Sequence, residues 1–311
     1  MGEVEIPALR VGDVRVRMIL APINPADLNV IEGTYPLRPS LPGVPGGEGV
    51  AVIEEIGAEV EGLSEGDRVL LPHGVGTWRQ MAIVPAEQLI RVPSEIADEQ
   101  AAMLRINPAT AFRMLADFVD LKPGDWVVQN VANSGVGRAV IEIAHQRGIR
   151  TVNVVRRAEL IEELKQHGAD IVLVDSEQLV DEIAEATEEG APRLGLNAVG
   201  GESALRIANV LASGGIHVTY GAMGRKPVRI PNGLLIFKDV SFRGFWVTRW
   251  YQQATIAERD EMFAELFALA GEGLFRTPVQ QCFRLGDFKE ALALAAEGGR
   301  NGKVVFAPQA K

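Results

Sequence analysis

The stretch that decides the fold is Trp126–Gln146, which reads WVVQNVANSGVGRAVIEIAHQ. It begins as an apolar strand, continues as a turn of small residues and ends with the apolar spacing of a helix. This order is typical of a dinucleotide fingerprint, because the backbone of such a turn can approach a pyrophosphate that faces the helix N-terminus. The match to G-x-G-x-x-G is incomplete, since Ala132 and Ser134 hold the first two positions and only Gly137 keeps the third. An ordinary tight turn is therefore the competing interpretation.

The alternation of strand and helix continues after this stretch, as far as VSFRGFW at residues 240–246. Such alternation predicts an α/β domain with a doubly wound parallel sheet, the Rossmann architecture, over residues 107–248. The predicted strands are TVNVV (151–155), IVLV (171–174), RLGLNAV (193–199) and GIHVTYG (215–221), and the predicted helices are Val136–Arg147, Ala158–Gln166, Ser176–Thr187 and Glu202–Leu211.

The first hundred residues have a different pattern, with short strands between glycines and prolines, which predicts a β-rich, partly open barrel. One helix interrupts it, because Asn24 supplies a cap, Pro25 the first helical position and Asp27 an early acid. We interpret Asp27 as a helix-start acid without a role in the chemistry. The predicted strands are Asp13–Leu20, Gly49–Ile56, Arg68–Leu71, Trp78–Val84 and Leu89–Val92.

The end of the chain returns to this first module. An amphipathic helix at 257–270 and the strand KVVFAP at 303–308 follow the Rossmann segment. We therefore expect a discontinuous catalytic domain made of residues 1–106 and 249–311, with the nucleotide-binding domain inserted between its two parts.

Composition excludes several classes of protein. The 311 residues carry 31 Lys and Arg against 41 Asp and Glu, a net charge of -10, which argues against nucleic acid as a partner. The longest apolar runs are too short to span a membrane. The acidic N-terminus lacks the features of a signal peptide, so we expect a cytoplasmic protein. The only cysteine, Cys282, forbids an internal disulfide, and its strand-like surroundings predict a buried small apolar residue.

Two arginines indicate which dinucleotide binds. Arg156 and Arg157 end the strand after the fingerprint helix, where an acid would hold the ribose 2′-hydroxyl of NADH. An acid would repel a 2′-phosphate, whereas a guanidinium can hydrogen-bond it in bidentate fashion. A solvated pair at a helix start is the alternative, but cations there oppose the helix dipole. The sequence therefore predicts NADPH as the cofactor.

No metal site is predicted, because one cysteine and four scattered histidines offer no ligand spacing. Of the histidines, His73 in a glycine-rich loop is the one that could face a cleft. Arginines that could contact the phosphates of coenzyme A are more simply interpreted as solvated surface residues; they are Arg79, Arg105, Arg113 and Arg249.

Several segments together resemble one family, the zinc-independent medium-chain dehydrogenases and reductases, and within it the trans-2-enoyl-thioester reductases of fatty acid synthesis. The resemblance covers nearly the whole chain. It implies a GroES-like catalytic domain, NADPH, and an acyl thioester of coenzyme A or acyl carrier protein as substrate, and it suggests a homodimer. The segments are INPADLNVIEGTYPLRPSLPGVPGGEGV, GVGTWRQ, RINPATAFRML, QNVANSGVGRAVIEIA, NVVRR, LNAVGG, VTYGAMGRKPV and LIFKDVSFRGFW.

The resemblance also implies the site. Tyr35 matches the family's catalytic tyrosine, and its phenol is the expected proton donor. Trp78 is expected to form an apolar wall for the substrate, with core packing as an equal alternative. The expected cofactor-binding residues are Asn107, Asn133, Ser134, Gly135, Val136, Gly137, Arg156, Arg157, Tyr220, Gly221, Ala222, Met223, Phe245, Trp246, Val247 and Lys303.

Three functions remain open at this point. The first is NADPH-dependent reduction of the C2=C3 double bond of trans-2-enoyl thioesters, with hydride added to the β-carbon. The second is an NADPH:quinone oxidoreductase, which needs hydride transfer but no specific proton donor. The third is an NADPH-binding protein without turnover, and the presence of Tyr35 argues against it.

Overall fold

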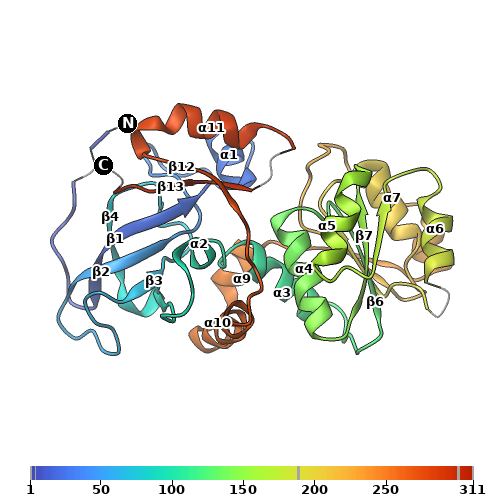
Figure 1. Ribbon diagram of the computed structural model, residues 1–311, viewed down its shortest axis with the longest axis horizontal. Coiled ribbons are helices and arrows are strands. Elements are labelled where there is room, and N and C mark those ends of the chain that lie inside the picture. The colour runs from blue at the N-terminus through green and yellow to red at the C-terminus, as the bar shows by residue number, and fades with distance from the viewer. Residues whose placement is uncertain (1, 4, 188–189, 300–301, 310–311) are drawn as a thin grey trace. The chain divides into compact units, whose positions relative to one another are not determined.

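The computed structural model describes residues 2–3, 5–187, 190–299 and 302–309. The chain divides into two compact units (Figure 1), of which unit 1 is Met1–Ile106 with Tyr251–Lys311 and unit 2 is Asn107–Trp250. The boundary expected after Thr248 and the boundary between the units both fall within helix α9 (Val247–Gln253). In the part of the chain that is described, no helix is both long and apolar enough to cross a membrane.

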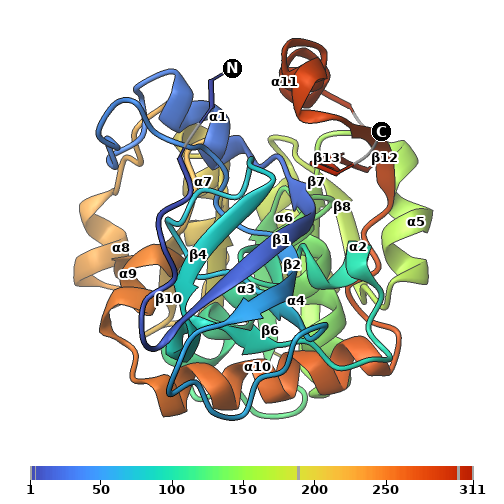
Figure 2. The ribbon, with the colours of Figure 1, turned by 90° about the vertical axis from the view of Figure 1, so that its left-hand side faces the viewer.

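Unit 1 is built on a seven-stranded sheet centred on β1 (Asp13–Pro22), which pairs antiparallel with β2, β4 and β13. Figure 2 shows β1 running between β2 and β4. Along β1 the buried residues alternate, as Val14, Val16 and Met18 point into the core. The other strands are β2 (Val50–Ile56), β3 (Arg68–Leu70), β4 (Met81–Pro85), β5 (Ile90–Arg91), β12 (Val279–Phe283) and β13 (Lys303–Phe306).

The longest helix of unit 1 begins where the sequence supplies a cap. In α10 (Ile256–Gly271), the Glu258 N–H donates to Thr255 Oγ1 at 3.2 Å and the Thr255 N–H donates back to Glu258 Oε2 at 2.8 Å. This reciprocal pair is a capping box. The remaining helices are α1 (Pro25–Ile31), α2 (Asp98–Ala101), α11 (Phe288–Ala296) and the short 3-10 turns η1 (Ala86–Gln88) and η3 (Leu285–Asp287).

Unit 2 is a six-stranded sheet in the order β11-β10-β9-β6-β7-β8, and every neighbouring pair is parallel. The chain starts at β6 and winds outward first to one side and then to the other, so the doubly wound Rossmann prediction is confirmed. The strands are β6 (Trp126–Asn130), β7 (Arg150–Val155), β8 (Ile171–Val174), β9 (Leu194–Asn197), β10 (Ile216–Thr219) and β11 (Ser241–Gly244). The helices are α3 (Asn107–Asp117), α4 (Gly135–Gln146), η2 (Ala158–Leu160), α5 (Ile161–Gln166), α6 (Leu179–Ala186), α7 (Gly201–Asn209) and α8 (Asn232–Ile236).

Some elements start later than the sequence predicts, among them a strand and a helix. The strand expected from Trp78 begins at Met81, because the Trp78 N–H bonds the Pro45 carbonyl in a loop instead of a strand neighbour. The helix expected from Ser176 begins at Leu179, after a turn closed by the Leu179 N–H and the Ser176 carbonyl.

The prediction that Cys282 is buried is wrong. The residue does lie in a strand, but its side chain is exposed. β12 is an edge strand of the sheet, and Phe283 is its one buried residue. An apolar strand pattern cannot distinguish an edge strand from a central one, so the cysteine was assigned to the core.

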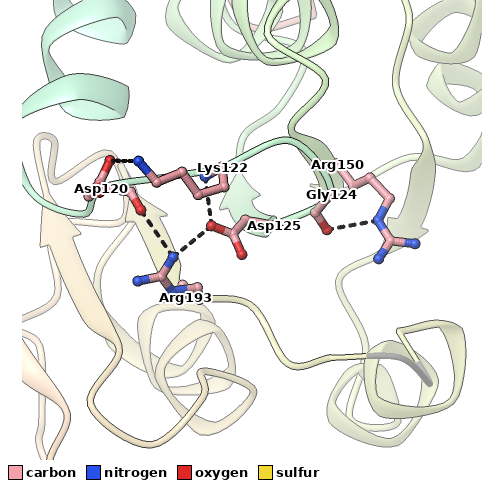
Figure 3. Close-up of polar contacts among 6 residues, drawn as sticks. All are labelled: Asp120, Lys122, Gly124, Asp125, Arg150 and Arg193. Atoms are coloured by element: carbon pink, nitrogen blue, oxygen red, sulfur yellow. Dashed lines mark hydrogen bonds and ion pairs between the residues drawn. The ribbon is translucent and has the colours of Figure 1, made fainter.

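A polar cluster ties together the amino ends of three strands of unit 2 (Figure 3). Arg193, just before β9, donates to Asp125 Oδ2 at 2.6 Å and to the Asp120 carbonyl at 3.0 Å. The Lys122 N–H donates to Asp125 at 2.8 Å, and Arg150 in β7 donates to the Gly124 carbonyl at 3.0 Å. The backbone bond from Lys122 and the Arg193 guanidinium lower the pKa of Asp125 below its ordinary value of 3.8.

We predict that Asp125→Asn lowers the free energy of unfolding by about 1 kcal/mol and Tm by roughly 2 °C, because it removes charge-assisted bonds that are partly exposed. A carboxyl with a lowered pKa stabilises the fold above its unfolded pKa and loses that effect as pH falls. The difference from wild type, measured by denaturant unfolding, should therefore shrink below about pH 4.

The matched control is Asp120→Asn, since that side chain is 81% exposed and, among the described residues, pairs with Lys122 alone. Its stability should equal that of wild type. An equal loss in both variants, or a loss in Asp125→Asn that persists at acid pH, contradicts the role given to Asp125.

Candidate active site

The turn between β6 and α4 is tightly closed. Ser134 caps α4, with its hydroxyl accepting the Gly137 N–H at 3.1 Å. A Cβ on Gly137 would lie 2.5 Å from the Ala132 carbonyl oxygen, so no larger residue fits there. Val131 has a φ of 52°, which is unusual for a β-branched residue and turns the chain sharply after the strand. The turn thus brings the backbone N–H groups of a twelve-residue helix to the sheet edge.

The predicted cofactor residues of unit 2 gather at one edge of the sheet. All six strands are parallel, so their carboxyl ends lie on the same side. Each predicted group directly follows one of these ends. Asn133 to Gly137 follow β6, Arg156 and Arg157 follow β7, Tyr220 to Met223 follow β10, and Phe245 to Val247 follow β11.

Buried amides hold the edge together where the strand order reverses, between β6 and β9. Asn130 Nδ2 donates to Asn197 Oδ1 at 2.9 Å, and the Ala198 N–H donates to Asn130 Oδ1 at 2.8 Å. Asn197 Oδ1 also accepts the N–H groups of Val199 and Gly200 at 3.0 and 3.1 Å. These residues were not identified from the sequence, although an asparagine at the end of two otherwise apolar strands was the available signal.

Two further predicted residues lie at the same turn. A Cβ on Gly135 would meet the Asn107 amide nitrogen at 2.7 Å, so Asn107 packs directly on the glycine. The Tyr220 hydroxyl is buried and has no hydrogen bond of regular geometry to the residues that the structure describes. Burial raises its pKa, while the Ser134 side chain beside it acts to lower the pKa. Phe245 packs edge-on against Phe118, with ring centroids 6.1 Å apart.

Arg156 and Arg157 are both exposed, and no side-chain hydrogen bond or ion pair links either guanidinium to another residue of the described chain. By contrast, Arg138 on α4 is already bound to Glu163 at 2.8 Å. The pair is therefore available to an external anion at the end of β7. The glycine turn, the buried Tyr220 hydroxyl and these guanidiniums together fit a dinucleotide with a 2′-phosphate.

Tyr35 lies in unit 1, in the loop that leaves α1. The N–H groups of Thr34 and Tyr35 donate to the Asn29 carbonyl at 2.9 and 3.1 Å, and Gly33 allows the turn with a φ of 72°. The loop is thus anchored on the last turn of the helix. The Tyr35 side chain is half-buried.

A buried polar cluster lies at the other end of α1, and it contains Lys303. Lys303 Nζ donates to Asn24 Oδ1, and Asn24 Nδ2 donates to Glu48 Oε1 at 2.8 Å. Glu48 Oε2 accepts the Ile106 N–H at 2.8 Å, and Asp27 Oδ2 accepts the Asn24 N–H at 2.8 Å. Asp27 is therefore part of a helix cap, as expected, but it also lies beside Lys303, which the sequence analysis did not foresee.

The two carboxyl groups of this cluster titrate close to neutral pH. Burial raises the pKa of Asp27 to about 6 and that of Glu48 to about 7, in each case against the attraction of Lys303. Glu48 was missed by the sequence analysis. Its signal was a lone acid between the glycines that precede the apolar start of a strand, Val50–Ile53.

Trp78 packs within unit 1. Its indole N–H donates to the Pro22 carbonyl at 3.4 Å and its ring meets Phe306 edge-on, with centroids 5.1 Å apart. These contacts favour the core-packing alternative, and a substrate-lining role for Trp78 stays a prediction.

The expectation that Arg105 is a solvated surface residue is wrong, since it is only 4% exposed. Its guanidinium lies over the Tyr251 ring at 4.5 Å, and Tyr251 stacks on His73 at 6.5 Å. Burial lowers the pKa of both His73 and Arg105.

The fold and these residues define a two-part nucleotide-dependent oxidoreductase, with the dinucleotide edge in unit 2 and the tyrosine and the polar cluster in unit 1. In the described ranges, no three His, Cys, Asp or Glu side chains gather as a metal site.

Comparison with known proteins agrees with this class. Residues 10–94 match the alcohol dehydrogenase GroES-like domain, and residues 135–265 match the family called zinc-binding dehydrogenase. The chain is 44% identical over 298 residues to the mitochondrial enoyl-[acyl-carrier-protein] reductase of Homo sapiens, covering 94% of this chain and 80% of the relative.

Solved structures show the same fold. The complex of Etr1p with NADP and crotonyl-CoA is 27% identical, with a TM-score of 0.88 over 98% of this chain and 93% of that one. The Escherichia coli quinone oxidoreductase complexed with NADPH is 24% identical, with a TM-score of 0.87 over 98% and 95% of the two chains, a likeness of fold alone. The chain belongs to the enoyl-[acyl-carrier-protein] reductases, within the medium-chain dehydrogenases and reductases.

We predict that replacing both Arg156 and Arg157 by alanine raises the Kd for NADPH at least tenfold, because each lost charged hydrogen bond costs ~1.5–3 kcal/mol. NADH, which lacks the 2′-phosphate, should bind as it does to wild type. Titration of nicotinamide fluorescence measures both constants.

Arg284→Ala, which removes an exposed arginine of unit 1, is the control and should change neither constant. Equal affinity of the wild-type protein for NADPH and NADH would overturn the assignment of the pair.

Proposed function

We propose that this protein is an NADPH-dependent trans-2-enoyl-thioester reductase that saturates the C2=C3 bond of an acyl chain carried on coenzyme A or acyl carrier protein. The observation that carries the proposal is the 44% identity to an enoyl-[acyl-carrier-protein] reductase over 94% of this chain. Tyr35 and the exposed Arg156–Arg157 pair agree with it.

The residues of unit 2 hold the cofactor. The α4 N-terminus and its Ser134 cap face the pyrophosphate, and Arg156 with Arg157 binds the 2′-phosphate. The segments after β10 and β11 lie along the nicotinamide half. When bound, NADPH supplies the hydride that reaches the β-carbon of the enoyl thioester.

The chain itself must stabilise the negative charge that develops on the thioester oxygen and deliver a proton to the α-carbon. We assign both tasks to Tyr35. A phenol with an ordinary pKa of ~10 is protonated at neutral pH and can donate. The two backbone bonds to Asn29 hold its loop in place before substrate binds, which limits the entropy lost on reaction.

Quinone reduction is the second candidate function, because a quinone oxidoreductase has the same fold. A quinone takes its protons from solvent and needs no positioned donor. The two functions therefore differ in their need for Tyr35. A protein that binds NADPH without turnover is the third candidate, and it would be stabilised thermally by NADPH while reducing neither substrate.

We predict that Tyr35→Phe lowers kcat on crotonyl-CoA by ~10²–10⁴-fold, the scale of a positioned acid, and leaves NADPH binding nearly unchanged. The substitution keeps the ring and removes only the hydroxyl. Loss of NADPH absorbance under saturating cofactor measures the rate, and fluorescence titration measures binding.

Quinone turnover, assayed in parallel, should be the same in the variant and in wild type. If the variant reduces crotonyl-CoA at the wild-type rate, Tyr35 is not the donor. If wild type reduces quinones and ignores every enoyl thioester, the proposed function is refuted.

We also propose that the protein is a homodimer joined through unit 2. β11 is the outer strand of the parallel sheet, and edge strands pair readily with another copy. Three consecutive apolar residues just before it are exposed, namely Leu235 at 47%, Ile236 at 68% and Phe237 at 87%. An exposed apolar patch beside a strand edge fits a second copy of the same surface.

Sedimentation velocity should give the mass of two chains for wild type, and Phe237→Glu should shift the protein toward the monomer because it places a charge in the apolar contact. Ile256→Glu, at an exposed apolar position on α10 in unit 1, is the control and should stay dimeric. A monomeric wild type would rule out this interface.

The cytoplasmic location stays a prediction.

A further inference from the structure

The buried cluster around Asn24 contains a hydrogen-bond chain whose direction is fixed at one end. The Ile106 N–H, part of the backbone, donates to Glu48 Oε2, and Asn24 Nδ2 donates to Glu48 Oε1. The other side of the same amide, Asn24 Oδ1, accepts from Lys303. Both Glu48 and Asn24 are essentially inaccessible to solvent, at 0% and 2% exposure.

Only one orientation of the Asn24 amide satisfies this chain. A carboxylate can only accept, so it must face the NH₂ group of Asn24, and the amide oxygen then faces the lysine. If the amide turned over, its oxygen would face a carboxylate and its NH₂ group would face an ammonium. Buried contacts between like partners leave polar groups unpaired and are costly.

We propose that Glu48 is a positioning residue that, by accepting hydrogen bonds from both Ile106 and Asn24, fixes the Asn24 amide and thereby holds the Lys303 ammonium in place for the cofactor. This inference rests on the proposed function and on the expectation from the family resemblance that Lys303 contacts NADPH. Glu48 itself is inaccessible to solvent, so we assign it an action through Asn24 and Lys303.

The surroundings of Glu48 favour this role over that of a simple structural anchor. Its charged and titratable neighbours are Lys303 from β13, Asp27 from α1, and Arg105 and Tyr251. His73 approaches the adjacent Gly47, and a Cβ on that glycine would lie 3.3 Å from Asp27 Oδ1. The cluster thus places two buried carboxylates around one lysine. Burying two carboxylates costs free energy that packing alone would not require, which favours a role in positioning the lysine.

The test reverses the direction of the hydrogen-bond chain through Asn24 and then restores it. In Glu48→Gln the amide oxygen accepts the fixed Ile106 N–H, so its NH₂ group faces Asn24 and forces that amide to turn over. Lys303 then faces an NH₂ group. We expect the Kd for NADPH to rise about tenfold, which corresponds to the loss of one good contact. In Asn24→Asp the new carboxylate faces Glu48, and binding should weaken to a similar degree.

The double variant Asn24→Asp with Glu48→Gln exchanges the carboxylate and the amide. The introduced glutamine would accept from Ile106 and donate to the introduced aspartate, which in turn would accept from Lys303, so every group is again paired. We expect the Kd for NADPH to return to within about threefold of wild type. If Glu48 acts only through a negative charge at residue 48, the double variant cannot restore NADPH binding. In that case the proposal fails.

A second readout separates positioning from folding. Tm of the protein without cofactor reports any structural cost, while Kd is measured on the folded protein. A fall in Tm with an unchanged Kd in Glu48→Gln would overturn the proposal. Glu54→Gln, on the strand β2 that follows Glu48 and in an exposed pair with Arg17, is the matched control and should alter neither Kd nor turnover.

A pH profile gives an independent check. When Glu48 is protonated, it has an O–H group where the hydrogen-bond chain needs an acceptor. The Glu48→Gln variant therefore resembles the protonated form of Glu48. The difference in Kd between wild type and this variant should shrink as pH falls from about 8 to 6, since burial raises the pKa of Glu48 to about 7. A constant difference across that range contradicts the proposal.

These outcomes are distinct from failure of the proposed function. If wild type binds NADPH but reduces no enoyl thioester, the function is wrong while the Kd comparison still decides the role of Glu48. If wild type reduces enoyl thioesters and the exchange variant does not recover NADPH binding, the function stands and the role of Glu48 falls.

Discussion

The close approach of Gly137 to the Ala132 carbonyl is the constraint on which unit 2 depends. A Cβ at residue 137 would lie 2.5 Å from that oxygen, so only glycine lets α4 begin directly above the end of β6. The helix N-terminus, capped by Ser134, then meets the same edge as the ends of the other five strands. Moving the helix outward would separate these groups and remove the anion-binding edge.

The strand–turn–helix pattern and the Arg156–Arg157 pair could be predicted because their signals are local. Periodicity within about twenty residues determines each element of the Rossmann sheet. The partners inside the site are not local. Asn130 and Asn197 are 67 positions apart, and Asn24 lies 279 positions from Lys303. No spacing rule joins such residues, so Glu48 and the paired amides appeared only once the sheets brought them together.

The wrong predictions for Arg105 and Cys282 also arise because the contacts that decide them are distant in the sequence. Arg105 looks like a surface residue in its own segment, but Tyr251, 146 positions later, covers its guanidinium and donates to its carbonyl at 2.8 Å. Cys282 looks buried in an apolar strand, but that strand forms the edge of its sheet. Exposure depends on the neighbours that the topology supplies, which a single segment of sequence does not contain.

The fold does not decide the reaction, since a quinone oxidoreductase shares it with a TM-score of 0.87. The residues that we propose to carry the chemistry lie near the two ends of α1, a helix of seven residues and about 10 Å. Its first turn is fixed by Asp27 and the Asn24 cluster, and its last turn anchors the Tyr35 loop through the Asn29 carbonyl. A short element therefore links the lysine that we assign to the cofactor with the phenol that we assign to proton transfer. Such a link suits a reaction in which hydride and proton must reach adjacent carbons, because both groups are positioned from the same helix.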